Sequence, residues 1–138
     1  MNLEDIFFPF LFLWSLIAAM TFVALFYKNA AYGRYFTLDS NYKIPSRIGW
    51  IIMESPTIIG MLIFIAMFKS KIGQTEIVFC VIWFSHYIHR TMIWPFRAQL
   101  KGKSMSFSVV SMALLFNFVN INLQCIWIFI LGNYGNDW

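Results

Sequence analysis

The chain has 138 residues, of which 60% are hydrophobic and only 12% are charged, and its formal net charge is +4. A composition this apolar excludes an ordinary soluble domain. The basic residues stand between long apolar runs, as membrane topology requires, so the positive charge does not indicate a nucleic-acid-binding protein. Cys80 and Cys125 each lie inside an apolar run. Both are therefore predicted to be packing residues rather than parts of a disulfide framework or a zinc site.

Four apolar segments are long enough to cross the hydrocarbon core as helices, which takes roughly 20 residues. They are predicted at residues 6–27, 48–68, 75–96 and 107–131. The sequence therefore predicts an all-α, polytopic membrane helix bundle with about four transmembrane helices, folded as a single membrane domain over residues 1–138. The first segment is expected to remain as a span, because Glu4 and Asp5 stand where a signal peptide carries basic residues.

The second and third predicted spans carry ionisable residues, which membrane helices rarely contain. His86, His89 and Arg90 share one helical face, and Tyr87 lies on its flank. Glu54 lies at a similar depth in the second span, roughly 9–14 Å below the same surface at 1.5 Å per residue, so it is expected to meet them. A purely structural Glu54–Arg90 pair is the alternative reading. Two histidines without a third ligand are a weak signal, and no metal site is predicted.

The fourth predicted span carries an amide stripe. Asn117, Asn120 and Gln124 follow i, i+3, i+7 spacing, which places them on one side of a helix near mid-bilayer. The stripe is predicted either to face the same cavity as the ionisable residues or to join helices by hydrogen bonds. This polar content also leaves open a broken or re-entrant segment.

The basic residues between the spans predict an orientation. The first connection holds Lys28, Arg34, Lys43 and Arg47, the third holds Arg97, Lys101 and Lys103, and the second holds only Lys69 and Lys71. Because Lys and Arg gather on the cytoplasmic side, the first and third connections are predicted to be cytoplasmic and the N-terminus lumenal.

A polar cluster inside a membrane suits chemistry on an apolar substrate. A Tyr hydroxyl held by a carboxyl group can donate a hydrogen bond or proton to an enone carbonyl and stabilise the enolate that forms on reduction. Arg90 lies too deep for a headgroup anchor and is a candidate for binding a cofactor phosphate. The residues alone thus indicate an enzyme acting on a lipid-like substrate.

Two stretches are more specific than composition. They are Tyr32-Gly33-Arg34-Tyr35 with Met53-Glu54-Ser55-Pro56, and His86-Tyr87-Ile88-His89-Arg90-Thr91 with Trp94-Pro95-Phe96. In order and spacing they resemble the steroid 5α-reductase family, and the resemblance covers nearly all of the chain. It implies the N-terminal part of a seven-helix family fold in the endoplasmic reticulum membrane, with NADPH as cofactor and a 3-oxo-Δ4 steroid as substrate.

The resemblance also implies roles for individual residues. Glu54 and Tyr87 match the catalytic pair that binds the substrate ketone, with Tyr87 as the acid and Glu54 orienting it. Tyr32 and Arg90 match cofactor-side residues, and Asn120 is a further expected substrate contact. The roles of His86 and His89 stay open.

Two departures from the family matter. Met53 stands where many animal members have Gln, so a polar contact is expected to be lost. Family members also continue for about as many residues again, through spans that supply most NADPH contacts. The chain alone is therefore expected to have little or no activity without a C-terminal half or a partner chain.

Three other functions remain open. A relative that reduces enoyl-CoA thioesters or polyprenols ranks lower, because the Tyr-Gly-Arg-Tyr and Met-Glu-Ser-Pro stretches favour the steroid branch. A catalytically silent, sterol-binding membrane protein is a different class of function, and a membrane methyltransferase is more distant.

Overall fold

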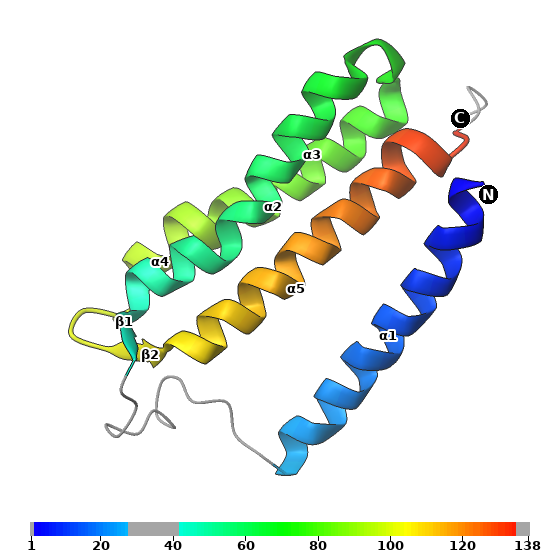
Figure 1. Ribbon diagram of the computed structural model, residues 1–138. Coiled ribbons are helices and arrows are strands. Elements are labelled where there is room, and N and C mark those ends of the chain that lie inside the picture. The colour runs from blue at the N-terminus through cyan, green and yellow to red at the C-terminus, as the bar shows by residue number, and fades with distance from the viewer. Residues whose placement is uncertain (1, 28–41, 135–138) are drawn as a thin grey trace.

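The computed structural model describes residues 2–27 and 42–134, which form an all-α bundle with one small two-stranded sheet (Figure 1). This confirms the predicted fold class. The elements in chain order are α1 (Leu3–Tyr27), β1 (Lys43–Pro45), α2 (Ser46–Phe68), the 3-10 turn η2 (Lys69–Lys71), α3 (Gln74–Ile88), the π-helical turn η3 (His89–Ile93), α4 (Trp94–Arg97), β2 (Ser104–Ser106), α5 (Phe107–Ile126) and the π-helical turn η4 (Trp127–Leu131).

Three helical stretches of the described chain are long and apolar enough to cross a membrane: Leu3–Tyr27, Ser46–Lys71 and Phe107–Leu131. The last is continuous, so the structure shows no break in the amide-bearing segment. The predicted span at 75–96 lies within a fourth helical stretch, formed by α3, η3 and α4. That stretch is roughly 36 Å long at 1.5 Å per residue, but its polar residues make it less apolar than the other three.

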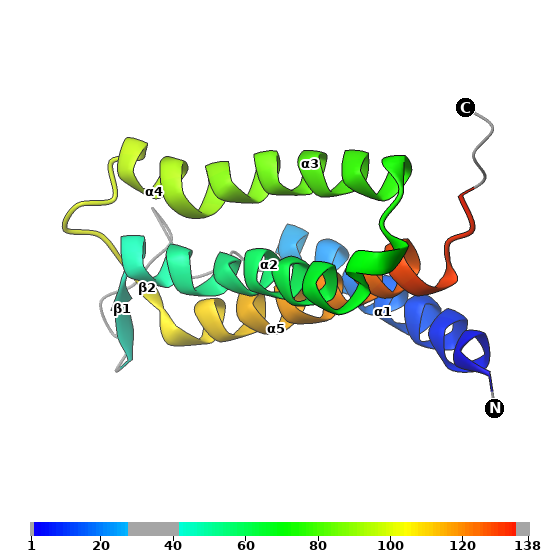
Figure 2. The same cartoon turned by 90° about the horizontal axis from the view of Figure 1, so that it is seen from above.

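The bundle is organised around the pair α2 and α5, which run in the same direction, while α3 and α4 run back along α2 in a separate layer (Figure 2). The close approach of α2 and α5 depends on two glycines of α2. A Cβ atom at Gly60 would lie 2.7 Å from Cγ1 of Ile121 on α5, and one at Gly49 would lie 3.0 Å from Cγ2 of Val110 on α5 and 2.8 Å from Sδ of Met105 on β2. Only a residue without a side chain fits there, as in other tightly packed membrane helices.

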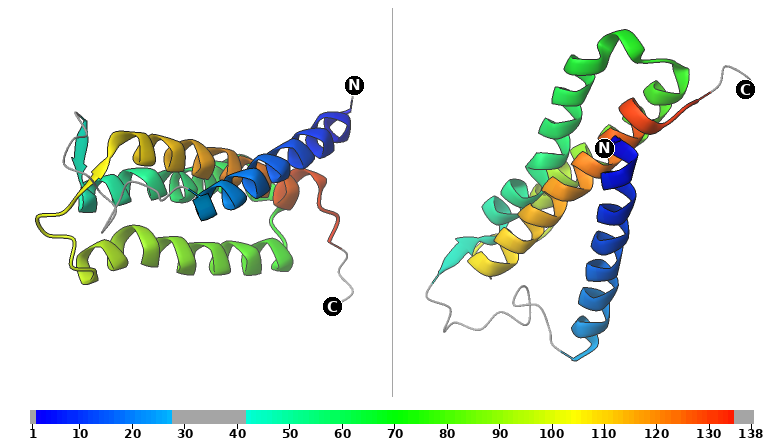
Figure 3. Two further views of the ribbon diagram at one scale, coloured as in Figure 1. Left: turned by 90° about the horizontal axis from the view of Figure 1, so that it is seen from below. Right: turned by 45° about the vertical axis from the view of Figure 1, so that its right-hand side comes forward.

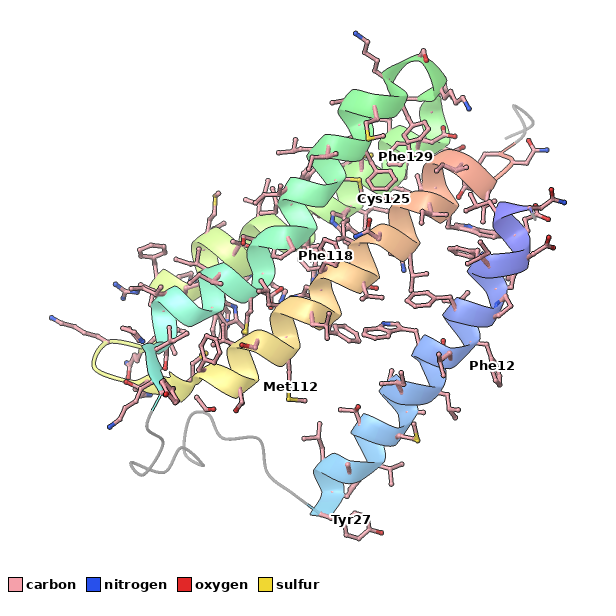
Figure 4. All side chains as sticks on the ribbon, viewed as in Figure 1. Phe12, Tyr27, Met112, Phe118, Cys125 and Phe129 are labelled. Atoms are coloured by element: carbon pink, nitrogen blue, oxygen red, sulfur yellow. The ribbon has the colours of Figure 1, made fainter. Side chains whose placement is uncertain are left out.

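A sulfur-containing core fills one end of the bundle. Met61, Cys80 and Cys125 are buried on α2, α3 and α5, and both thiols lie against the Met61 sulfur, at 3.8 and 3.9 Å. Cys125 and Phe129 lie between the helices in Figure 4. The two cysteines are free and buried, as the sequence predicted for packing residues.

The opposite end is closed by the two strands. β1 pairs antiparallel with β2, with Ile44 opposite Met105. Both of these side chains point into a second small core around Met53 and Val110. Because α2 and α5 each begin directly after a strand, the pairing sets the starts of both helices at one level (Figure 1).

Helix α1 stands largely apart from the other helices. It meets α5 and η4 through ring contacts, Phe7 and Phe8 against Trp127 and Trp14 against Phe116, and diverges from α5 towards its C-terminal end (Figure 3). Most of its apolar side chains are exposed, including Phe12 (Figure 4). An apolar surface of this kind fits lipid or a further helix rather than water.

Candidate functional site

The Met-Glu-Ser-Pro stretch lies inside α2, which stays helical although it contains Pro56. Pro56 has no backbone N–H, so the carbonyl of Ile52 lacks its usual helical donor. The Ser55 hydroxyl donates to that carbonyl at 2.9 Å and takes the place of the missing amide. The helix therefore continues through the proline, and the Thr57 hydroxyl donates to the carbonyl of Glu54 at 2.6 Å.

Glu54 is buried and paired with Arg90, as expected from their similar depths. The Arg90 guanidinium donates to Glu54 Oε1 from Nη2 at 2.5 Å and from Nε at 3.0 Å. Asn117 of α5 donates to the Met53 carbonyl at 2.7 Å and, at 3.4 Å, to Glu54 Oε2. Residues of α2, η3 and α5 thus meet at one carboxylate. Glu54 is only 3% exposed, and the Arg90 cation balances its buried negative charge.

Arg90 lies on a π-helical turn. The N–H of Trp94 bonds to the His89 carbonyl across this turn, just before Pro95. The guanidinium carbon lies 5.3 Å from the centroid of the Trp50 ring, which itself packs against Trp94 at 4.2 Å. π-helical turns are rare in proteins, and those that do occur often lie at functional sites. Here the turn carries the only cation that forms an ion pair within the described residues.

Tyr87 is held from two sides. Asn120 of α5 donates to its hydroxyl oxygen at 3.4 Å, and its ring packs against Trp83 at 4.5 Å and edge-on against His86 at 4.9 Å. Trp83 is itself anchored, because its indole N–H donates to the Thr57 carbonyl at 3.0 Å. The sequence suggested that a carboxyl group would hold this tyrosine; in the described residues an amide occupies that place.

Beyond the edge-on contact of His86 with the Tyr87 ring, the remaining predicted site residues take no part in these contacts. His86 and His89 are exposed, and so is Gln124. Of the amide stripe, Asn117 and Asn120 therefore each bond to another helix, while Gln124 does not. Tyr32 lies outside the described residues. No three His, Cys, Asp or Glu side chains come together in the part of the chain that the structure describes.

Sequence reasoning missed Trp50 and Trp83, the two indoles that flank the site. Each stands four residues before a polar site residue on its own helix, Trp50 before Glu54 and Trp83 before Tyr87. This spacing places both side chains of a pair on one face, so the sequence did carry a signal for the two indoles.

An open apolar groove of about 390 Å³ lies on α2 and α5. It is lined by Pro56, Ser111, Leu114, Leu115 and Phe118 and does not include any predicted site residue.

The arrangement offers three chemical groups inside a helix bundle. Tyr87 carries a hydroxyl whose oxygen already accepts a bond, Arg90 carries a half-exposed cation, and Glu54 carries a buried carboxylate. A hydroxyl whose oxygen accepts one bond keeps its hydrogen available for another acceptor. The site can thus polarise a carbonyl or bind an anion beside an apolar molecule.

Known proteins similar to this chain are enzymes of steroid reduction. The chain is 28% identical over 137 residues to steroid 5-alpha-reductase DET2 of Solanum lycopersicum, covering 97% of this chain and 53% of that protein. It is 27% identical to 3-oxo-5-alpha-steroid 4-dehydrogenase 1 of Mus musculus, covering 92% and 50%. With the same-named protein of Macaca fascicularis it shares 28% identity, covering 80% and 42%.

These comparisons confirm the resemblance to steroid 5-alpha-reductases along most of the chain. The chain spans about half the length of the curated relatives it matches. No protein-family model matches it.

Proposed function

We propose that this chain is the substrate-binding, N-terminal half of a membrane reductase of the steroid 5-alpha-reductase family, which reduces the Δ4 double bond of a 3-oxo steroid with NADPH. The observation that carries the proposal is that two amides of α5, one helical turn apart, hold the two proposed groups: Asn117 donates to the Arg90-paired carboxylate of Glu54, and Asn120 donates to the hydroxyl of Tyr87. It occurs within a sequence that is similar, over most of its length, to those of steroid reductases.

Tyr87 is the proposed acid. Asn120 donates to the Tyr87 oxygen, so the hydroxyl hydrogen remains free for the ketone oxygen of a steroid. As the β-carbon of the enone is reduced, negative charge develops on this oxygen, and a donor already in place stabilises that charge. Trp83 and His86 fix the direction of the ring, which limits the reorganisation needed when the substrate binds.

Glu54 is proposed to act beside Tyr87 at the same ketone. Its Oε1 is occupied by Arg90, whereas Oε2 has only the long contact with Asn117 among the described residues. Oε2 is therefore the atom left to accept a hydrogen bond from the substrate oxygen once that oxygen is protonated. The Arg90 cation balances the charge of this carboxylate in an apolar setting.

The described residues fit NADPH at one point. Arg90 uses Nε and Nη2 for Glu54, and its side chain is 40% exposed, so its remaining edge can hold a phosphate or amide oxygen of the cofactor. When bound, NADPH supplies the hydride that the β-carbon accepts. The other contacts are proposed to come from a second half, on the same polypeptide or on a partner chain.

Steroid binding by the purified chain in detergent tests the proposal. With a radiolabelled 3-oxo-Δ4 steroid, Tyr87→Phe is expected to weaken binding about tenfold, because it removes one hydrogen bond to a buried ketone. Tyr27→Phe is the matched control, since Tyr27 is exposed at the end of α1. Equal affinity for the wild type and Tyr87→Phe would contradict the proposed role. Stronger binding of an enoyl-CoA than of the steroid would move the assignment to the thioester branch.

A catalytically silent sterol-binding protein is the second candidate. It is favoured by the pairing of Glu54 with Arg90, which also satisfies both groups without any chemistry. The two candidate functions predict different results for Glu54→Gln. Unchanged steroid affinity in this variant, with no reduction when the chain is combined with the C-terminal half of the Solanum lycopersicum relative, would favour the silent protein.

A further inference from the structure

Five cationic side chains gather at the end of the bundle that holds β1 and β2. They are Lys43 on β1, Arg47 at the start of α2, Arg97 at the end of α4, and Lys101 and Lys103 in the connection to β2, a set we term the basic end. No acidic side chain of the described residues lies at this end. The described acidic residues are Glu54 inside the bundle and Glu4, Asp5 and Glu76 at the opposite end (Figure 1).

The basic end is built on a fixed frame. The strands pair over three residues, the N–H of Ser46 bonds to the Lys103 carbonyl at 2.9 Å, and the N–H of Phe107 bonds to the Tyr42 carbonyl at 3.1 Å. Gly102 turns the connection with a positive φ of 74°, between the two lysines. Backbone hydrogen bonds thus join the segments that carry Lys43, Arg47 and Lys103.

Exposed apolar side chains directly adjoin these cations. Ile48, Phe96 and Phe107 are 52, 60 and 55% exposed, and they follow Arg47, precede Arg97 and follow β2 in the chain. Arg47 links the two kinds of surface, since its Nε donates to the Pro95 carbonyl at 3.2 Å and its guanidinium lies 4.9 Å from the Phe96 ring centroid. A ligand bound at the basic end would therefore contact positive charge and, directly beside it, an apolar surface.

We infer that the basic end binds the phosphate headgroup of an anionic membrane lipid, with the acyl chains against the neighbouring apolar side chains. The cations stand where two apolar helices begin, α2 and α5, which is the level of the lipid headgroups. Anionic phosphate is the natural partner of a Lys and Arg cluster at this depth. The adjoining apolar surface favours a lipid over a soluble phosphate, which has no acyl chain to place there.

Lipid retention by the purified chain tests the inference. The chain is placed in nanodiscs of phosphatidylcholine with phosphatidylinositol, extracted into mild detergent, and its bound lipid is measured by native mass spectrometry. The wild type is expected to retain phosphatidylinositol. Lys43→Gln/Lys101→Gln/Lys103→Gln should weaken retention roughly a hundredfold, since each charge near an anionic surface contributes roughly fivefold.

The opposite end supplies the control. Lys69→Gln/Lys71→Gln removes two exposed cations there and is expected to leave retention unchanged. Equal loss in both variants would overturn the inference, because it would show a response to net charge alone. Competition by 2′,5′-ADP with the same dependence on Lys43 and Lys103 would also overturn it, since the ligand would then be a soluble phosphate. Should the triple variant unfold, Lys103→Gln alone replaces it, and lipid retention by the wild type is measured at increasing salt concentration. Retention that neither the single substitution nor salt weakens would also overturn the inference.

Discussion

At the scale of single residues, Pro56 shows how the sequence keeps a membrane helix continuous at a breaking residue. In lipid no water can satisfy a carbonyl that has lost its amide partner. Ser55 supplies the missing donor to Ile52, and the uninterrupted helix then presents Glu54 to Arg90 and Asn117. A helix-breaking proline and the serine that compensates for it thus help to place the buried carboxylate.

Ser55→Ala is expected to lower the free energy of unfolding by about 1 kcal/mol, because the Ile52 carbonyl is left without a donor. The same substitution in a Pro56→Ala background should have almost no effect, since the amide of residue 56 then bonds to that carbonyl. Unfolding in mixed micelles, followed by circular dichroism, measures both values. Equal losses in the two backgrounds would show that the serine acts in some other way.

At the scale of elements, the contact between α2 and α5 positions the site. Gly49 and Gly60 are three helical turns apart and mark the face of α2 that lies against α5. Between them, Met53 and Thr57 are buried. Any separation of the two helices would move Asn117 away from Met53 and Glu54 and would open the carboxylate to its surroundings.

Gly60→Ala is expected to destabilise the bundle by about 1–3 kcal/mol, because the new methyl group overlaps the Ile121 side chain. In an Ile121→Ala background the methyl group has room, and alanine is the better helix former. There the substitution should be neutral or stabilising. Thermal unfolding of the four proteins in one detergent gives the comparison, and a loss that persists in the Ile121→Ala background would exclude overlap as its cause.

The sequence allowed the helices to be predicted but not the details that join them. Apolar runs as long as 6–27 or 107–131 leave few alternatives to a membrane helix. Strands of three residues carry no such signal, because the pairing of Ile44 with Met105 depends on residues distant in the chain. Equal depth was enough to predict that Glu54 and Arg90 meet. The partner of Tyr87 depends on how α5 is rotated against α3, which periodicity in one helix cannot supply.

At the scale of the whole molecule, β1–β2 pairing places the starts of α2 and α5 and the connection from α4 to β2 at one end, with η2 at the other (Figure 1). This agrees with an up-and-down path for α2, α3 and α5. The charge distribution favours a cytoplasmic location for the end with the strands. We propose this orientation in the endoplasmic reticulum membrane, with the N-terminus in the lumen.

Labelling of sealed microsomes with a membrane-impermeant amine reagent tests the orientation. Lys101 and Lys103 are exposed and should react from the outer, cytoplasmic face. Lys69 and Lys71 are also exposed and should react only after the vesicles are opened with detergent. Mass spectrometry of the peptides distinguishes the two pairs, and the reverse pattern would place the strands in the lumen.

The buried sulfur core makes the protein naturally suited to site-directed spectroscopy. Both cysteines pack against Met61 inside the bundle, where a thiol reagent cannot reach them while the helices stay together. A cysteine introduced on the exposed face of α1 or in the connection after α4 can therefore carry a spin label or a fluorophore without removal of the native thiols. The same two thiols become reactive when the bundle opens, so the untreated protein already contains its own reporter of unfolding.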